Sequence, residues 1–119
     1  MELPVTGIVS ASRRLTSRIE ASGEVWVYWQ CGLRADLSRV RNLSAGGMFL
    51  ELRQPLAKGL TTVLHFLVQE GPIRANAEVR YAVPDDGLGL KFTAVERDCG
   101  PQLAELLARL RGIQRGAKN

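Results

Sequence analysis

Between residues 25 and 95 turn-forming residues divide the chain into short apolar segments, and this spacing constrains the fold most strongly. The segments are rich in β-branched and aromatic side chains, as in Val25-Trp26-Val27-Tyr28-Trp29, and such side chains favour strands. Glycine, proline and aspartate separate the segments, most clearly at Pro84-Asp85-Asp86-Gly87, a sequence suited to a hairpin turn. The pattern therefore predicts consecutive antiparallel strands.

Six strands are expected, over residues 25–29, 35–41, 48–52, 61–69, 73–83 and 88–95. An irregularity is expected at the end of the second strand, before Asn42. The fourth segment is nearly continuously apolar, so we expect most of both its faces to be covered. In the fifth segment, alternation predicts one shared face for Ala77, Val79, Tyr81 and Val83.

The hydrophobic period changes near the end of the chain. Four leucines there recur at helical spacing: Leu103, Leu106, Leu107 and Leu110. Asp98 is a candidate helix cap, Pro101 suits the first turn, and Gly112 is expected to end the helix. These features predict a C-terminal amphipathic helix.

Together the segments predict a mainly β fold, a small antiparallel six-stranded β-barrel plugged by the C-terminal helix. Residues 1–12 are small, polar and weakly patterned, and we expect them to form a mobile N-terminal arm. Residues 13–111 are expected to form the folded domain, and residues 112–119 a frayed basic tail.

Composition is consistent with a single domain of 119 residues, of which 45% are hydrophobic and 24% charged. The net charge of +4 comes mainly from arginine, whose planar guanidinium suits guanine edges and phosphates, so an anionic partner is favoured. Cys31 and Cys99 form no Cys-x-x-Cys pair and are expected to be free, half-buried thiols in a reducing cytosol. No apolar segment is long enough for a signal peptide or a membrane span, so we expect a cytoplasmic protein without a membrane partner.

Two short polar motifs follow one another along the chain. The first, Arg14-Leu15-Thr16-Ser17-Arg18, carries two guanidinium groups, and Arg13 directly before it adds a third. The second, Asn42-Leu43-Ser44-Ala45-Gly46-Gly47, offers two short hydrogen-bonding side chains and then glycines. The glycines permit positive φ and a close approach of a ligand to the backbone. In combination the motifs predict a site for a planar, hydrogen-bonding, doubly anionic ligand.

Arg-x-x-x-Arg upstream of Asn-x-Ser-x-x-Gly resembles the signature of the PilZ domain, a bacterial family that binds the second messenger cyclic di-GMP. Gly87-Leu88-Gly89-Leu90-Lys91-Phe92 resembles the last barrel strand of that family. The resemblance extends from Arg13 to about Arg111 and implies a receptor that is not an enzyme. Biofilm formation and motility are typical outputs of the family.

The resemblance also implies which residues contact cyclic di-GMP: Arg13, Arg14, Arg18, Asn42, Ser44, Gly46, Gly47 and Tyr81. Arg14 and Arg18 would bind guanine O6 and N7 or phosphate, and Arg13 would accompany two ligand molecules per protomer. The family usually has aspartate at the position of Asn42, so the missing charged acceptor is expected to weaken binding. Tyr81 would present its ring to a guanine. The ligand would order the arginine-rich segment against the barrel and alter a surface that a downstream protein contacts.

Two alternatives to a messenger receptor remain open from the residues. A PilZ-like module could bind a protein through a barrel face or the C-terminal helix without needing nucleotide. A small barrel could instead bind RNA or single-stranded DNA through its positive charge and aromatic side chains, with a steep dependence on salt.

Neither a catalytic nor a metal site is expected. The aromatic residues Trp26, Tyr28 and Trp29 are expected in the core and barrel wall. His65, the only histidine, lies in an apolar strand and is expected to be a packed side chain. One histidine and two distant cysteines do not make a metal site, and Asp85 and Asp86 belong to a turn.

Overall fold

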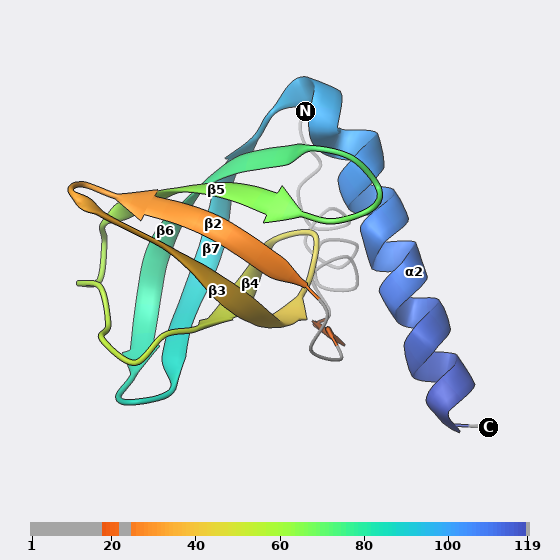
Figure 1. Ribbon diagram of the computed structural model, residues 1–119, viewed down its shortest axis with the longest axis horizontal. Helices are drawn as coiled ribbons and strands as arrows, with labels where there is room; N and C mark the ends of the chain where they lie inside the picture. Colours follow the sequence, from red (N-terminus) through yellow and green to blue (C-terminus); the bar gives the residue numbers. More distant parts are fainter. Residues whose placement is uncertain (1–17, 22–24, 119) are drawn as a thin grey trace, which may run out of the picture.

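The computed structural model describes residues 18–21 and 25–118, with side chains up to Ile113 (Figure 1). These residues form seven strands, a 3-10 turn and one long helix. In chain order the elements are β1 (Ile19–Glu20), β2 (Trp26–Cys31), β3 (Arg34–Leu43), β4 (Gly47–Glu51), β5 (Thr61–Leu67), β6 (Ile73–Val83), β7 (Gly87–Val95), η1 (Arg97–Cys99) and α2 (Gly100–Lys118).

The strands close into one antiparallel barrel. β3, β2, β5, β6, β7 and β4 are hydrogen-bonded in that order, and β4 pairs back with β3. The short β1 continues the line of β2 along β3, because Ile19 lies opposite Leu43 and Trp26 lies opposite Arg39. The predicted six-stranded antiparallel barrel with a C-terminal helix is confirmed, while the predicted arm at residues 1–12 lies outside the described residues.

Side chains of β2 alternate between the core and the outer surface, as the pleat of a strand requires. Val27, Trp29 and Cys31 are buried in the barrel. Trp26 and Tyr28 point the other way and are 40% and 39% exposed. Of the three aromatic residues of this strand, only Trp29 therefore belongs to the core.

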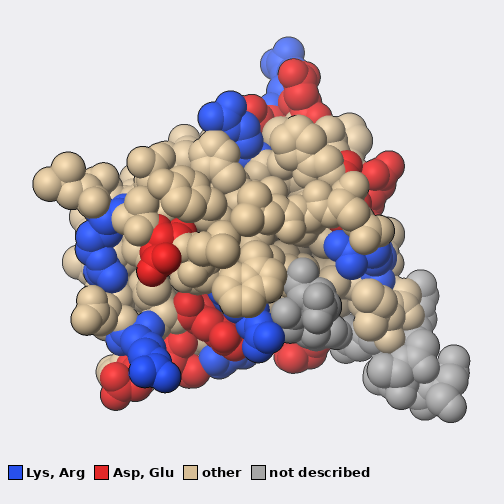
Figure 2. Space-filling view, viewed as in Figure 1, with Lys and Arg blue, Asp and Glu red and all other residues tan. Residues whose placement is uncertain are grey.

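β5 alternates in the same way, so the prediction that both its faces are covered is wrong. Val63 and Leu67 are 38% and 56% exposed, because the wall of a barrel has only one face toward the core. Together with exposed side chains of β2 and β3 they form an outer apolar face: Trp26, Tyr28, Leu37, Val63 and Leu67. Figure 2 shows the side of the molecule where β2 and β3 lie in front, with a largely uncharged centre and charged residues gathered along its margins.

A bulge in β6 overturns the predicted alternation of that strand. Ala77 and Val79 are buried, whereas Tyr81 and Val83 are exposed. The register with β7 shifts between Val79 and Tyr81, so that Arg80 is an extra residue on β6. Tyr81 therefore points to the opposite side from the one that the sequence pattern predicts.

The expected irregularity in β3 is confirmed between Val40 and Asn42. There the Arg41 guanidinium donates hydrogen bonds to both carboxylate oxygens of Asp86, one of them at 2.9 Å, and to Glu51 at 3.3 Å. The hydrogen bond from Arg41 is the main reason that the pKa of Asp86 lies below its ordinary value. Arg41, at the bulge of β3, thus links this strand to β4 and to the turn between β6 and β7.

α2 lies along the barrel near β1, as Figure 1 shows. Its four leucines are buried: Leu103, Leu106, Leu107 and Leu110. A bidentate ion pair fixes the helix to the loop before β6, with Arg109 Nη2 at 3.1 Å from Glu70 Oε1. The Glu70 side chain is only 7% exposed, and the hydrogen bond from Arg109 lowers its pKa. Among the described residues, no helix is long and apolar enough to cross a membrane.

The predicted helix end at Gly112 is wrong, because α2 continues to Lys118. A glycine inside a helix costs only about 1 kcal/mol relative to alanine, which does not end a helix by itself. Pro101 lies in the first turn as predicted, whereas Asp98 lies within η1 rather than at the helix start. Cys31 and Cys99 are free, as predicted, but are buried rather than half-buried.

Barrel closure requires glycine at the first residue of β4. A Cβ on Gly47 would lie 2.1 Å from the carbonyl oxygen of Leu90 in β7. One residue earlier, the Gly46 carbonyl accepts a hydrogen bond of 2.8 Å from the Phe92 N–H. Two backbones therefore meet here with no room for a side chain between them.

We predict that Gly47→Ala lowers the free energy of unfolding by about 1–3 kcal/mol, because an overpacked site must move backbone. The measurement is urea unfolding followed by circular dichroism. Gly112→Ala is the matched control: nothing lies within 4 Å of its added Cβ, so this variant should gain about 0.5–1 kcal/mol. A Gly47→Ala protein as stable as the parent would contradict the close approach of β4 and β7.

Candidate functional site

The turn between β3 and β4 is built around the side chain of Ser44. This side chain is buried, and its Oγ accepts hydrogen bonds from the N–H groups of Gly46 and Gly47 at 3.1 and 3.2 Å. The Ser44 N–H donates to the Gly47 carbonyl at 2.8 Å. The structure thus shows that the Ser44 side chain is bonded to its own turn.

Gly47 is needed in this motif because there is no room for a side chain, and not because of an unusual backbone angle. Positive φ values among the glycines that the structure describes occur at Gly32, Gly59 and Gly71. Neither Gly46 nor Gly47 therefore uses the positive φ that glycine permits. The close approach of a ligand to this backbone stays a prediction, and the structure shows instead that Gly47 lies against β7 with no room for a Cβ.

A hydrogen bond joins the two polar motifs. Arg18 Nη1 donates to Asn42 Oδ1 at 2.8 Å across a sequence separation of 24 residues. The pairing of β1 with β3 makes this contact, because Glu20 lies opposite Asn42 and Arg18 directly precedes β1. The two-residue strand β1 thus brings together two motifs that lie far apart in the sequence.

A surface pocket of about 340 Å³ lies beside this contact. Its lining comes from the chain before β1, the β3–β4 turn, β6 and β7: Arg18, Ser44, Gly46, Gly47, Arg80, Tyr81, Gly89, Leu90 and Lys91. Five predicted site residues therefore meet at one hollow, and Asn42 adjoins it through Arg18. Arg13 and Arg14 lie outside the described residues.

Sequence reasoning missed two cations of this pocket, Arg80 and Lys91. Regular alternation would separate Arg80 from Tyr81 on opposite sides of β6, and only the bulge brings both to one pocket. Lys91 belongs to the strand-like Gly87–Phe92 segment, in which nothing marks it as a pocket residue. Arg80 also lies 3.9 Å from Glu78, but both side chains are exposed, so this ion pair is weak and leaves Arg80 available to an anion.

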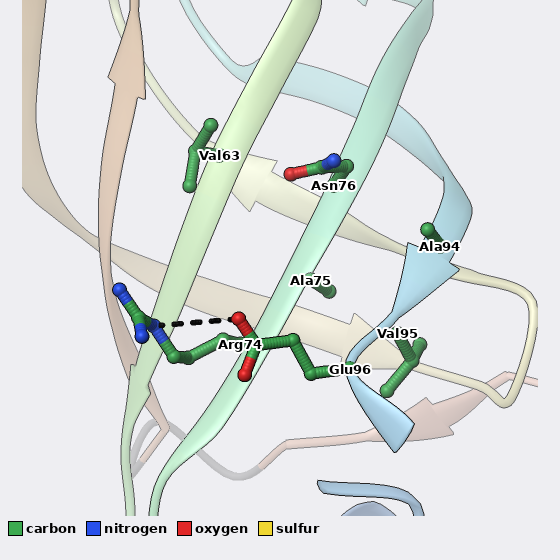
Figure 3. A pocket seen from close by; sticks show the side chains of 7 residues that line it. All are labelled: Val63, Arg74, Ala75, Asn76, Ala94, Val95 and Glu96. Carbon is green, nitrogen blue, oxygen red and sulfur yellow. Dashed lines mark ion pairs between the residues drawn. The ribbon is translucent and has the colours of Figure 1, made fainter. Parts of the chain in front are cut away.

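A second, smaller hollow of about 150 Å³ lies over β5, β6 and the end of β7 (Figure 3). Arg74 and Glu96 face each other there at 3.8 Å, beside Val63 and Asn76. None of the predicted ligand-binding residues lines it.

In the described part of the chain, no three His, Cys, Asp or Glu residues lie together as a metal site would require. His65 is half-buried beside Tyr28, with ring centroids 6.2 Å apart.

Solved structures of other proteins share this fold at low sequence identity. MrkH of K. pneumonia, in a complex with c-di-GMP, matches with a TM-score of 0.67 and 17% identity over 87% of this chain and 53% of its own. The PilZ domain of YcgR from Escherichia coli, with c-di-GMP, gives 0.58 and 17% over 89% and 95%. PlzA of Borreliella burgdorferi, also with c-di-GMP, gives 0.61 and 11% over 83% and 43%. The chain thus spans about half the length of MrkH.

Sequence comparison identifies the family directly. No curated protein matches the chain. The model of the PilZ domain, by contrast, matches residues 12–109, which include both polar motifs and every strand of the barrel. The chain therefore belongs to the PilZ domain family.

Proposed function

We propose that this protein is a cytoplasmic, non-enzymatic receptor for cyclic di-GMP, with its messenger-binding domain over residues 13–111. The contact residues proposed are Arg13, Arg14, Arg18, Asn42, Ser44, Gly46, Gly47 and Tyr81. Membership of the PilZ family supports the ligand, as do three structural relatives that were solved with c-di-GMP.

The observation that carries the proposal is the hydrogen bond between Arg18 and Asn42. It brings the two motifs together at a pocket that Gly46 and Gly47 also line. A guanidinium has five N–H donors, and this contact uses one of them. Arg18 therefore keeps donors for a guanine edge or a phosphate without releasing Asn42.

The charge of the pocket fits a ligand with two phosphates. Arg18, Arg80 and Lys91 line it, and all three side chains are exposed. Phosphate oxygens accept charge-assisted hydrogen bonds from such groups, and these are roughly twice as strong as neutral ones. We therefore add Arg80 and Lys91 to the proposed contacts.

Asn42 limits the strength of the site. An aspartate there would offer a charged acceptor to the N1 and N2 protons of guanine, whereas the amide oxygen is neutral and already accepts from Arg18. We propose that the receptor binds less tightly than its Asn42→Asp variant would. The messenger concentration needed for half-saturation is then correspondingly higher.

Signal transmission is proposed to work by ordering. Cyclic di-GMP would bridge the arginine-rich segment that contains Arg13, Arg14 and Arg18 to the barrel, and so change the surface that a downstream protein meets. Arg18 begins the described chain and lines the pocket, which supports this proposal.

A second candidate function is a protein-interaction module that does not need nucleotide. The observation in its favour is the outer apolar face, where Trp26, Tyr28, Leu37, Val63 and Leu67 are all between 38% and 56% exposed. Exposed apolar patches of this kind often mark contacts between proteins. In a messenger receptor, the same face would be the surface that contacts the downstream protein.

Titration calorimetry with cyclic di-GMP tests the receptor function. The parent protein should bind two ligand molecules per protomer, and Arg18→Ala should weaken binding about 10- to 100-fold through the loss of charge-assisted hydrogen bonds. Arg97→Ala is the charge-matched control, because Arg97 is exposed in η1 beyond the end of β7. It should stay within about twofold of the parent.

Equal affinities for the parent and Arg18→Ala, or no heat with the parent, would contradict the proposed site. Oligonucleotides in the same cell distinguish a nucleic-acid barrel, since their competition should rise steeply as salt falls. A messenger receptor should ignore them.

Limited proteolysis with trypsin tests the ordering step. Cleavage within residues 13–18 should slow several-fold when cyclic di-GMP is saturating, because an ordered segment fits a protease active site poorly. Cleavage at other arginines serves as the internal control. Equal rates within this segment with and without ligand would exclude ordering as the signal.

A further inference from the structure

The ring of Tyr81 rests on Gly89. A Cβ built on Gly89 would lie 2.1, 2.3 and 2.7 Å from the Cε1, Cζ and Cδ1 atoms of that ring. Three ring atoms so close to one point show that the ring occupies the space of the missing side chain. Because β6 and β7 are paired with Tyr81 opposite Gly89, the register itself produces this contact.

A second aromatic residue is paired with the same glycine from the other side. Phe49 of β4 also lies opposite Gly89, so that β4, β7 and β6 present the row Phe49, Gly89 and Tyr81. The two ring centroids are 6.3 Å apart with planes tilted by 35°, a distance typical of interacting aromatic pairs. Phe49 is 6% exposed and Tyr81 47%, so Phe49 is the packed member and Tyr81 the open one.

Phe49 is itself held from two directions. The guanidinium carbon of Arg41 lies 4.7 Å from its ring centroid, and Arg41 is anchored by Asp86 and Glu51. On the β7 side, a Cβ on Gly87 would lie 2.6 Å from Phe49 Cε2. The position of the Phe49 ring, and with it one edge of the Tyr81 ring, is therefore set by the barrel.

Tyr81 is at the same time part of the pocket wall, together with Gly89 and Arg18. One side of its ring is taken up by Gly89, and 47% of the residue is exposed. Stacking of a base on an aromatic ring depends on the height and tilt of that ring, so whatever fixes the ring influences the stacking.

We propose that Gly89 is a positioning residue for ligand binding, which seats the Tyr81 ring so that its open face stacks on a guanine of the messenger. This inference rests on the proposed function. It assigns to Gly89 a role beyond allowing strand pairing, because its missing side chain determines where the ring lies.

Gly89 can be substituted without disrupting the barrel. The three atoms nearest to an added Cβ on Gly89 all belong to the Tyr81 side chain, which can rotate away, whereas the atom nearest to a Cβ on Gly47 or Gly87 is a carbonyl oxygen at 2.1 or 2.2 Å. Gly89→Ala should therefore fold and displace the ring. Gly100→Ala is the matched control, since nothing lies within 4 Å of its Cβ.

The experiment is a double-mutant cycle on the affinity for cyclic di-GMP, with the parent, Gly89→Ala, Tyr81→Ala and the double variant. Loss of one stacked base weakens binding roughly 5- to 150-fold. We expect about a tenfold loss for Gly89→Ala alone and no further loss when it is added to Tyr81→Ala. Tyr81→Phe should keep the affinity within about threefold, because the ring remains.

Two affinity results would contradict the proposed role of Gly89: parent-like affinity of Gly89→Ala, or an equal loss of affinity with and without the Tyr81 ring. The aromatic NMR signals of Tyr81 in the ligand-free proteins add a reading that needs no binding. They should shift in Gly89→Ala and not in Gly100→Ala, and unchanged signals would also overturn the proposal. A parent protein that binds no cyclic di-GMP would instead refute the proposed function, and with it the stacking role.

Discussion

β4 closes the barrel only because Gly47 has no side chain. The space for a Cβ is taken by the Leu90 carbonyl, so β4 can lie between β3 and β7 at normal pairing distance with glycine at this point. The same approach brings the β3–β4 turn against β7, where the Phe92 N–H bonds the Gly46 carbonyl. Closure of the barrel and formation of the pocket therefore depend on the same glycine, which explains why this motif ends in glycine.

A second feature of the pocket is that its side chains are already bonded within the fold. Ser44 is used by its own turn, and Arg18 extends the pairing of β1 with β3 through Asn42. The Gly46 and Gly47 N–H groups are taken up by Ser44, and the Arg18 guanidinium is held by one hydrogen bond, so the turn and this side chain are already fixed. Such preorganisation would lower the ordering cost of a ligand that binds here.

Much of the fold could be predicted because strands and turns are encoded locally. The segments around Trp29, Leu50 and Leu88 carry β-branched or apolar residues between turn formers, and each became a strand. The bulge at Arg80 could not be predicted, because it depends on pairing with a strand that comes later in the sequence. The bulge turned Tyr81 outward and brought Arg80 to the same pocket, so the sequence pattern could not identify Arg80 as a pocket residue. The continuation of α2 past Gly112 was missed since a glycine penalty of about 1 kcal/mol is small.

An amide NMR titration of the isotope-labelled chain with cyclic di-GMP tests the central claim most directly. If the messenger occupies the pocket between the β3–β4 turn and β7, the largest changes should fall on Gly46, Gly47, Tyr81 and Lys91. Signals of the outer apolar face around Tyr28 and Val63 should stay nearly constant. Changes concentrated on that outer face, or none at saturating ligand, would contradict the assignment of the pocket as the messenger site.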